Sequence, residues 1–406
     1  MFCYANTFQQ LDALLTANRQ YWQFVPFADK GFAWEEQHPE FCDWLASIDD
    51  QTLAHLNQDQ QALINAFTPW IPDAALLAKL AETSRLTGSE HIYPRNFDAG
   101  IPGRKWQQIT AFNQVLPRLG VPWLEWCAGK GFLGRVLSVT HQQPVTSLEW
   151  QQQLCVDGEA AAKQLGLDIH FVQGDAFDVS SQQYIQPKQH AVALHACGDL
   201  HVSLIKQVVA KKGQAVSVSP CCYHLIRDKQ YQPLSSGAKA SKLQLSKHDL
   251  RLPLQETVTA GNRVKQLRFV EVSFRLGFDL LQREVNQTND YLPIPNVQKA
   301  LLGEGFEAFC LWAAEQKGMT LPDDINFDYW QQLGEKRFAI TERMELVRQL
   351  FRRPLELWLV LDRVCFLEES DYKVTLGTFC EKQMTPRNLL IHAERVCSMR
   401  ENITAR

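Results

Sequence analysis

The chain has 406 residues, 45% of them hydrophobic and 21% charged, with a net charge of −4 at neutral pH. This composition excludes a wholly disordered protein, and the length is typical of two or three domains. No window approaches the roughly 20 consecutive apolar residues of a membrane span, and residues 1–7 lack the charged and apolar regions of a secretory signal. The 11 cysteines include no CxxC pair, which predicts a reducing, cytoplasmic location rather than a disulfide framework.

Residues 1–94 are predicted to form a helical N-terminal domain. Apolar residues such as Leu11, Leu14 and Leu15 recur at helical spacing, and prolines separate the segments. This region is acidic, with 4 Lys/Arg against 12 Asp/Glu. The segment 88–103 is rich in glycine and proline and predicts a linker to a second domain, 95–406.

From residue 120 onward, short apolar runs alternate with helical stretches. This rhythm predicts an α/β, Rossmann-like parallel sheet with helices on both faces. The predicted strands are 123–127, 145–150, 169–173, 191–196 and 215–220, and the predicted helices are 132–140, 151–166 and 200–212.

A loop and helical insertion is predicted over about 225–350. Residues 204–275 hold 13 Lys/Arg and 4 Asp/Glu, a net charge of +9, so this basic block predicts an anionic partner, with RNA favoured. A solvated lysine-rich loop, or packing of the block against acidic residues 1–94, remains an alternative. Helices are predicted over 267–285 and from 297 to about 350. Two strands, 355–366 and 372–379, are predicted to form a hairpin across 367–371.

A glycine loop follows the first predicted strand. Gly129, Gly131 and Gly134 fit GxGxxG at the start of a helix, which lets backbone approach a dinucleotide or S-adenosylmethionine (SAM). Glu125 lies within the first strand end, where it would crowd a pyrophosphate but could steady a loop around a cationic methionyl group. Glu149 and Asp175 end the next two strands. Three carboxylates at successive strand ends favour SAM over NAD, although an NAD oxidoreductase stays open.

Polar, sulfur-containing clusters follow the fourth and fifth predicted strands. The first is His195-Ala196-Cys197-Gly198-Asp199, and the second includes Cys221-Cys222-Tyr223-His224. Because ligands of open parallel sheets bind beyond the carboxyl ends of strands, both clusters are placed for chemistry. Their spacing matches no usual zinc pattern, so no metal is predicted. No G-x-S-x-G elbow is present, which argues against serine hydrolase chemistry.

These motifs together resemble a class I SAM-dependent methyltransferase family. Its relatives include the methyltransferase-like twenty-five group, the glutathione S-transferase C-terminal-domain-containing protein and, more distantly, the tRNA position-four 2′-O-methyltransferases. The stretches Leu361-Asp362-Arg363 and Thr385-Pro386-Arg387-Asn388-Leu389 also resemble the first group. The resemblance covers roughly 100–225 and 355–395, and this chain lacks the cysteine/histidine zinc modules of the tRNA enzymes.

The resemblance implies a seven-stranded SAM-binding sheet whose last two strands are the hairpin at 355–380. It places SAM over Gly129 and Gly131, with Glu149 on the ribose and Asp175-Ala176 near the adenine. The implied cofactor-binding residues are Glu125, Cys127, Ala128, Gly129, Gly131, Glu149, Trp150, Asp175, Ala176 and His195.

Methyl transfer from SAM requires the enzyme to hold the nucleophile in line and, for a hydroxyl or ammonium acceptor, to remove a proton. His195, Asp199 and His224 are the candidate bases, and Tyr223 could orient a planar acceptor. The expected function is methyl transfer to RNA. Protein or small-molecule N-methylation and a non-catalytic SAM-binding scaffold remain alternatives, and the oligomeric state is left open. The candidate catalytic residues are His195, Cys197, Asp199, Cys222, Tyr223 and His224.

Overall fold

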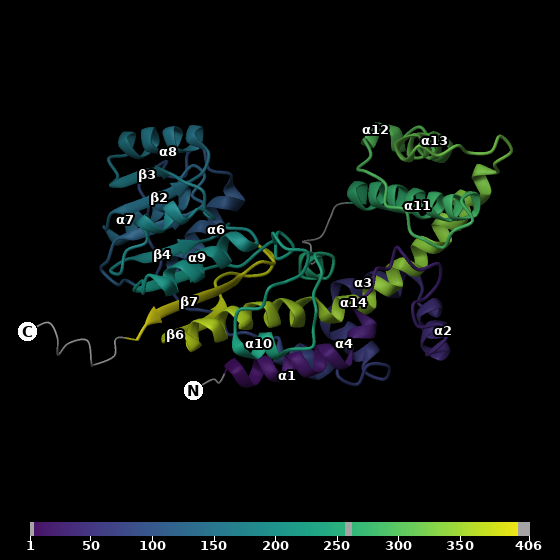
Figure 1. Ribbon diagram of the computed structural model, residues 1–406, viewed down its shortest axis with the longest axis horizontal. Helices are drawn as coiled ribbons and strands as arrows, with labels where there is room; N and C mark the ends of the chain where they lie inside the picture. The colour runs from purple at the N-terminus through teal and green to yellow at the C-terminus, as the bar shows by residue number, and fades with distance from the viewer. Residues whose placement is uncertain (1–3, 256–261, 397–406) are drawn as a thin grey trace, which may run out of the picture. The chain divides into compact units, whose positions relative to one another are not determined.

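The computed structural model describes residues 4–255 and 262–396. The chain divides into two compact units, drawn in Figure 1. The sheet unit comprises 1–17, 79–258 and 352–406, and the helical unit comprises 18–78 and 259–351. Residues 1–17 and 79–94, which the sequence assigned to an N-terminal domain, therefore belong to the unit that holds the sheet. The functional domain limits 1–94 and 95–406 stay a prediction.

The sheet unit is built on seven strands in the order β3-β2-β1-β4-β5-β7-β6, and the labelled strands can be followed in this order in Figure 1. Strands β1 to β5 pair in parallel, and β7 runs antiparallel to both β5 and β6. This arrangement confirms the predicted α/β Rossmann-like sheet. The strands are β1 (Trp123–Trp126), β2 (Val145–Glu149), β3 (Ile169–Gln173), β4 (His190–Ala193), β5 (Ala215–Val218), β6 (Tyr372–Thr378) and β7 (Leu389–Arg395).

Helices cover the parallel strands because those strands are apolar on both faces. Every residue of β1, β4 and β5 is buried, which explains why they read as continuous apolar runs rather than as alternating patterns. Helix α7 packs on β1, β2 and β3, α8 on β2 and β3, and α9 on β4 and β5. The helices of this unit include α1 (Tyr4–Ala17), α6 (Gly103–Gln114), α7 (Phe132–His141), α8 (Gln152–Gln164), α9 (Asp199–Ala210) and α10 (Ser236–Ala240).

The predicted strand at 355–366 is wrong, and so is the hairpin turn at 367–371. Residues 355–369 belong to α14 (Phe327–Glu369), and the partner of β6 is β7, which follows it in the chain. The side chains of Leu355, Trp358 and Leu361 are at most 1% exposed. A helix buried on all sides carries a continuous apolar run, which periodicity cannot distinguish from a buried strand.

The helical unit has a core of its own, formed largely by α11 and α13. Phe274 and Phe278 of α11 pack with Phe306 and Phe309 of α13. The first part of α14 also belongs to this unit, and the helix continues into the sheet unit. None of the helices in the described ranges has the length and apolar character needed to cross a membrane. The other helices are α2 (Pro39–Ser47), α3 (Asp50–Gln58), α4 (Gln60–Phe67), α5 (Ala74–Leu80), α11 (Asn262–Val285), α12 (Lys299–Leu302) and α13 (Phe306–Lys317).

Candidate functional site

The sheet has its topological switch point between β1 and β4. From β1 the chain proceeds outward through β2 to β3, whereas β4 leads in the opposite direction to β5. Loops that leave neighbouring strands in opposite directions open a crevice beyond their carboxyl ends. The glycine loop leaves β1, and the loop that contains His195 leaves β4. The sequence motifs therefore meet at the position where an open α/β sheet binds its ligand.

Three residues of the glycine loop adopt the left-handed backbone conformation: Cys127 (φ 58°), Gly129 (φ 59°) and Gly131 (φ 65°). A Cβ atom on Gly131 would lie 2.4 Å from the ring of Phe171, so packing against β3 requires glycine there. A Cβ on Gly129 would meet no atom within 4 Å. Gly129 therefore leaves space at the mouth of the crevice, where a ligand can approach the backbone.

Glu149, at the end of β2, fixes the conformation of this loop. Its Oε2 accepts a hydrogen bond from the Gly129 backbone N–H at 2.9 Å, and its Oε1 accepts one from Gln151 at 3.0 Å. The side chain is only 6% exposed. The carboxylate thus connects the loops after β1 and β2. Its predicted contact with a ribose stays a prediction.

Glu125 is a buried carboxyl group directly beneath the glycine loop. It accepts a hydrogen bond from the Ser147 hydroxyl at 2.7 Å. Burial raises the pKa of Glu125 to about 7, although the Ser147 hydrogen bond and the nearby positive charge of Lys105 act in the opposite direction. The group therefore changes charge near neutral pH, and a cation bound beside it would favour the ionised form.

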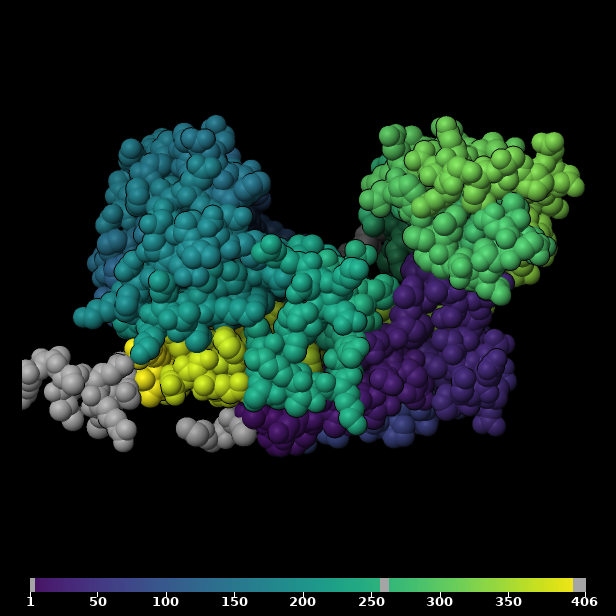
Figure 2. Space-filling model, in the orientation of Figure 1, coloured from purple at the N-terminus to yellow at the C-terminus, as the bar shows by residue number. Residues whose placement is uncertain are grey.

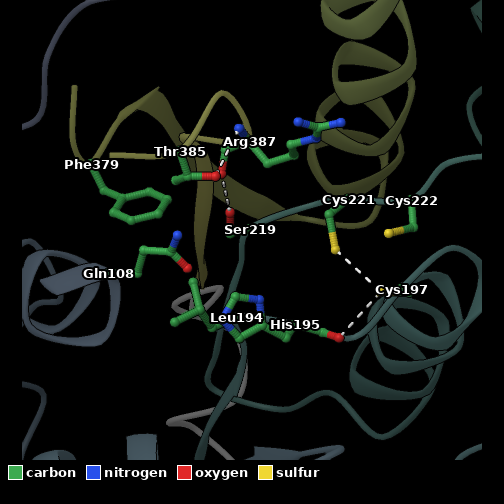
Figure 3. Close-up of a pocket in the computed structure, with 10 residues that line it drawn as sticks. All are labelled: Gln108, Leu194, His195, Cys197, Ser219, Cys221, Cys222, Phe379, Thr385 and Arg387. Carbon is green, nitrogen blue, oxygen red and sulfur yellow. Dashed lines mark hydrogen bonds between the residues drawn. The ribbon is translucent and has the colours of Figure 1, made fainter. Parts of the chain in front are cut away.

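Two cavities adjoin at the switch point and share Leu194 and His195. The glycine-loop cavity has a volume of about 80 Å³ and is lined by α6, the end of β1 and the glycine loop, including Lys105, Glu125, Cys127, Ala128, Gly129 and Phe132. The thiol cavity, drawn in Figure 3, has a volume of about 250 Å³ and is lined by Gln108, Leu194, His195, Cys197, Ser219, Cys221, Cys222, Phe379, Thr385 and Arg387. Both volumes lie below the roughly 300 Å³ of a typical ligand pocket, so each holds part of a ligand rather than a whole one.

His195 is positioned to serve both cavities. It follows β4 and lines each of them. Burial of the ring and the charge of Lys105 lower the pKa of His195 below its usual value of 6.5. The imidazole is therefore neutral at pH 7 and able to accept a proton.

Three cysteine thiols meet on the other side of the thiol cavity. The Sγ atoms of Cys197 and Cys221 are 3.6 Å apart, and those of Cys197, Cys221 and Cys222 all lie within 4.8 Å of one another. Hydrogen bonds from Cys197 and Cys221 lower the pKa of the Cys222 thiol. The pKa values of the other two thiols are raised. The sequence predicted two clusters at neighbouring strand ends, but not that the three thiols lie this close to one another.

Three of the candidate catalytic residues do not line either cavity. Tyr223 is 1% exposed, and its hydroxyl is bound to Glu356 at 3.2 Å. Asp199 accepts a hydrogen bond from the Arg227 backbone N–H at 2.7 Å and begins α9. His224 is half-buried and lies outside both linings. His195, Cys197 and Cys222 are the candidates that the structure brings together around the thiol cavity.

The predicted adenine region lies at the open edge of the site. Asp175 is exposed and accepts a hydrogen bond from the Phe177 backbone N–H at 2.9 Å. Ala176 is buried, and its carbonyl oxygen accepts from Ser203 at 2.8 Å. Trp150 is 67% exposed and lies outside the linings of both cavities. The predicted contacts of Trp150, Asp175 and Ala176 with the cofactor stay predictions.

A buried polar network holds the loop after β4 in place. The Nδ1 atom of His201 is 2.9 Å from the Ala196 carbonyl oxygen, and its Nε2 accepts from Arg363 at 2.8 Å. Arg363 also donates to the Tyr231 hydroxyl at 3.0 Å, which in turn donates to Asp362 at 2.6 Å. The motif Leu361-Asp362-Arg363 therefore acts from α14, by positioning the loop that carries His195 and Cys197.

Several cavity residues were not predicted because they lie far from the recognised motifs in the sequence. Lys105 and Gln108 are in α6, and Phe379 follows β6. Ser219 directly follows β5 and donates to the Arg387 carbonyl oxygen at 3.3 Å. Thr385 and Arg387 were noted only as part of a resemblance, and that stretch was the available signal for them.

One family model matches the part of the chain that contains the glycine loop and both cysteine clusters. Residues 104–229 match the family model described as "Methyltransferase domain". The chain thus carries a methyltransferase domain, and the match confirms the predicted Rossmann-like fold and the predicted enzyme class, for which SAM is the cofactor. A comparison with curated proteins finds no significant match.

Solved structures similar to part of the chain include three from microorganisms. The putative methyltransferase of Haloferax volcanii, solved with the Trm112 methyltransferase activator, is 18% identical with a TM-score of 0.24 and covers 30% of this chain and 56% of its own. Fibrillarin of Aeropyrum pernix with bound SAM is 11% identical with a TM-score of 0.24, covering 28% and 52%. An rRNA methylase of Streptococcus thermophilus is 14% identical with a TM-score of 0.22, covering 30% and 72%. This chain thus spans about half the length of the first two.

Proposed function

We propose that this protein transfers the methyl group of SAM to an acceptor group that enters the thiol cavity. The observation that carries the proposal is that two cavities adjoin at the switch point and share His195. One cavity is formed by the glycine loop, and the other is large enough for a single acceptor group such as a nucleobase or a side chain. Methyl transfer requires a donor site and an acceptor site that meet at one point.

The residues of the donor site fit SAM. When bound, SAM supplies a methyl group on a cationic sulfur for in-line displacement. Gly129 leaves room for close approach, Glu149 holds the loop, and Glu125 offers a carboxylate beneath it. Asp175 and Ala176 would lie toward the adenine.

On the acceptor side, His195 would take the proton released by a hydroxyl or ammonium nucleophile. The same cavity contains the Cys197 and Cys222 thiols and the residues Thr385 and Arg387 of the resembled motif. These features favour the closer relationship to the methyltransferase-like twenty-five group that the sequence motifs suggest.

Replacing Gly129 by alanine is expected to weaken SAM binding by at least about tenfold, or 1.4 kcal/mol, because the added methyl group occupies the approach to the loop. Gly120 provides a matched control, since it is also left-handed (φ 65°) and a Cβ there also meets no atom within 4 Å. Both substitutions should cost the same backbone strain, about 1 kcal/mol. The two variants should therefore be equally stable, and calorimetric titration then compares their affinities for SAM without a difference in folding. Equal SAM affinity in the two variants would contradict the proposed donor site.

The affinity for SAM should depend on the ionisation of Glu125. Because the pKa of Glu125 in the folded protein is raised to about 7, its carboxylate forms mainly above that pH and is lost as the pH falls through it. If the cationic ligand binds only the ionised form, affinity should rise about tenfold from pH 6 to pH 8. Glu125→Gln should remove the contribution of Glu125 to the pH dependence of SAM affinity. Any contribution from the ionisation of SAM itself should be the same for the wild type and the variant. An identical pH profile for the two proteins would exclude this role.

RNA is the acceptor class that the surface of the sheet unit favours. Lys239, Lys242 and Lys247 are exposed, as are Lys206, Lys211, Lys212, Arg227, Lys229 and Arg251 of the same basic block. In Figure 2 the teal-green part of the chain, up to residue 255, forms part of the face shown. One acidic residue of the N-terminal segment contacts the basic block, because Asp12 accepts a hydrogen bond from the Ser241 hydroxyl.

Reversing two of these charges should weaken RNA binding and its salt dependence. Lys239→Glu with Lys242→Glu is expected to reduce the slope of log affinity against log salt by about 1.4, since each of two phosphate contacts on a single strand contributes roughly 0.7. The double variant Lys163→Glu, Lys188→Glu changes the net charge equally at exposed sites outside the block. Fluorescence anisotropy with a labelled RNA distinguishes the two. If both double variants lose the same affinity, a specific basic surface is excluded.

A further inference from the structure

We propose that Cys197, Cys221 and Cys222 bind one zinc ion at the wall of the thiol cavity. This inference does not depend on methyl transfer, because it concerns only the three thiols and their surroundings. It revises the prediction from sequence that the chain has no metal site. That prediction relied on the positions of the cysteines in the chain, including the adjacency of Cys221 and Cys222, because adjacent cysteines rarely both bind one tetrahedral ion. Chain positions did not show that the loops after β4 and β5 bring all three sulfurs within 4.8 Å of one another.

The spacing of the sulfur atoms fits a single tetrahedral ion. With a Zn–S distance of about 2.3 Å, two ligands at the tetrahedral angle lie roughly 3.8 Å apart. The observed separation of the Cys197 and Cys221 Sγ atoms is 3.6 Å, and all three Sγ atoms lie within 4.8 Å of one another. A 4Fe–4S cluster would hold its cysteines further apart, since each binds a different iron. A disulfide would use only two of the three sulfurs and would leave Cys222 without a role.

The backbone holds the three thiols together before any ion binds. The Gly198 N–H donates to the Cys221 carbonyl oxygen at 3.0 Å, which joins the two loops next to the sulfurs. A Cβ on Gly198 would lie 2.1 Å from the Leu225 carbonyl oxygen, so this close approach requires glycine. Cys222 adopts a left-handed conformation (φ 47°), which is rare for a residue other than glycine. In Figure 3 the three cysteines lie together on one side of the cavity, and a dashed line joins Cys197 to Cys221.

The charges around the cluster suit a metal thiolate. Hydrogen bonds from the other two thiols lower the pKa of Cys222, and the nearby Arg387 and His224 contribute in the same direction. Zinc binds thiolates, so its binding releases the remaining thiol protons. Three thiolates and one Zn²⁺ carry a net charge of −1, which the guanidinium of Arg387 in the same cavity can offset.

Three thiolates leave the fourth position of a tetrahedral zinc ion for another donor. Among the described residues, only the three cysteines have ligand atoms within 4.8 Å of one another, so the fourth donor is not a neighbouring histidine or carboxylate of this group. A water molecule or the acceptor in that position would make the site an open one, as in catalytic zinc centres.

The experiment measures metal content and thiol chemistry in the full chain. The wild-type protein, purified under reducing conditions from zinc-supplemented cells, should contain about one zinc ion per chain by mass spectrometry. Cys197→Ser and Cys222→Ser should each lose it, whereas Cys310→Ala, which removes a buried thiol of the helical unit, should retain it. Because a variant could fail to fold, the wild-type zinc is also removed with a chelator and replaced with cobalt. An intense near-ultraviolet thiolate-to-cobalt absorption is expected.

Three results would overturn the proposal. The first is wild-type protein that contains no stoichiometric metal and shows no thiolate-to-cobalt absorption. The second is a zinc content that is unchanged in both serine variants. The third is a Cys197–Cys221 disulfide found in place of the metal. Gly129→Ala should retain the zinc ion, so failure of the metal site and failure of the proposed SAM site give different results.

Discussion

Replacement of His195 by asparagine is expected to lower the rate of methyl transfer by about 10²–10⁴-fold, the usual contribution of a general base. The reason is its position, because His195 lines both the glycine-loop cavity and the thiol cavity. SAM affinity should change much less, by about twofold, since the glycine loop and Glu149 remain in place. Single-turnover rates with labelled SAM, together with calorimetric affinity, separate these two effects.

The pH dependence of the methyl-transfer rate tests the role of His195 as the base in a second, independent way. Burial and the charge of Lys105 lower the pKa of His195 below 6.5. At saturating SAM, where the effect of Glu125 on affinity no longer limits the rate, the wild-type rate should therefore be constant near pH 7 and fall as the pH decreases through that lowered pKa, where the imidazole gains a proton. His195→Asn should lose this acidic limb. His170→Asn, at an exposed position of β3, is the matched control and should keep both the rate and the limb. A His195 variant with an unaltered rate and profile would rule out its role as the base.

Asp362→Ala is expected to destabilise the protein by about 3–5 kcal/mol, the usual cost of removing one partner from a buried charged network. Asp362 is fully buried in α14. Its carboxylate accepts hydrogen bonds from the Tyr231 hydroxyl at 2.6 Å and from the backbone N–H groups of Leu234 and Ser235 at 2.9 Å and 2.7 Å. The substitution leaves three buried donors without an acceptor and the Arg363 charge without its carboxylate neighbour.

Glu369 is the matched control for this substitution. It is also in α14, and it accepts hydrogen bonds from the backbone and hydroxyl groups of Ser236, but it is exposed. Glu369→Ala should cost less than about 1 kcal/mol because water can replace its bonds. Urea unfolding followed by circular dichroism compares the two. Similar losses of stability would show that burial of the Asp362 network is not what stabilises this region.

The fold of the central sheet could be predicted because its signals are local. Strands β1 to β5 appear as short apolar runs separated by amphipathic helices, and every residue of β1, β4 and β5 is buried. The C-terminal part was harder to predict. Residues 355–366 are apolar on every side because they cross the interior of the sheet unit as a helix, so they looked like a strand. The true partner of β6, β7 (Leu389–Arg395), was not predicted as a strand at all.

The candidate site was predictable where its residues follow strands in sequence. Glu125, Gly129 and Glu149 lie close together because the carboxyl ends of parallel strands meet at one edge. The thiol cavity was not predictable in this way, because Gln108, Phe379 and Arg387 come from distant segments of the chain. Tyr223 shows the limit of motif reasoning. It lies within a chemically suggestive cluster, yet its ring is buried beside Arg363, 5.6 Å from the guanidinium carbon.

Methyl transfer from SAM bound at the glycine loop is the activity proposed for this protein. The most direct test incubates the wild-type protein, Gly129→Ala and Gly120→Ala with methyl-labelled SAM and a cell lysate, and then separates RNA, protein and small molecules. We expect label in the RNA fraction with the wild type and Gly120→Ala, reduced at least about tenfold with Gly129→Ala at subsaturating SAM. Label confined to protein or small molecules would contradict the RNA acceptor alone. No label in any fraction, with SAM binding intact, would contradict the claim and leave a SAM-binding scaffold.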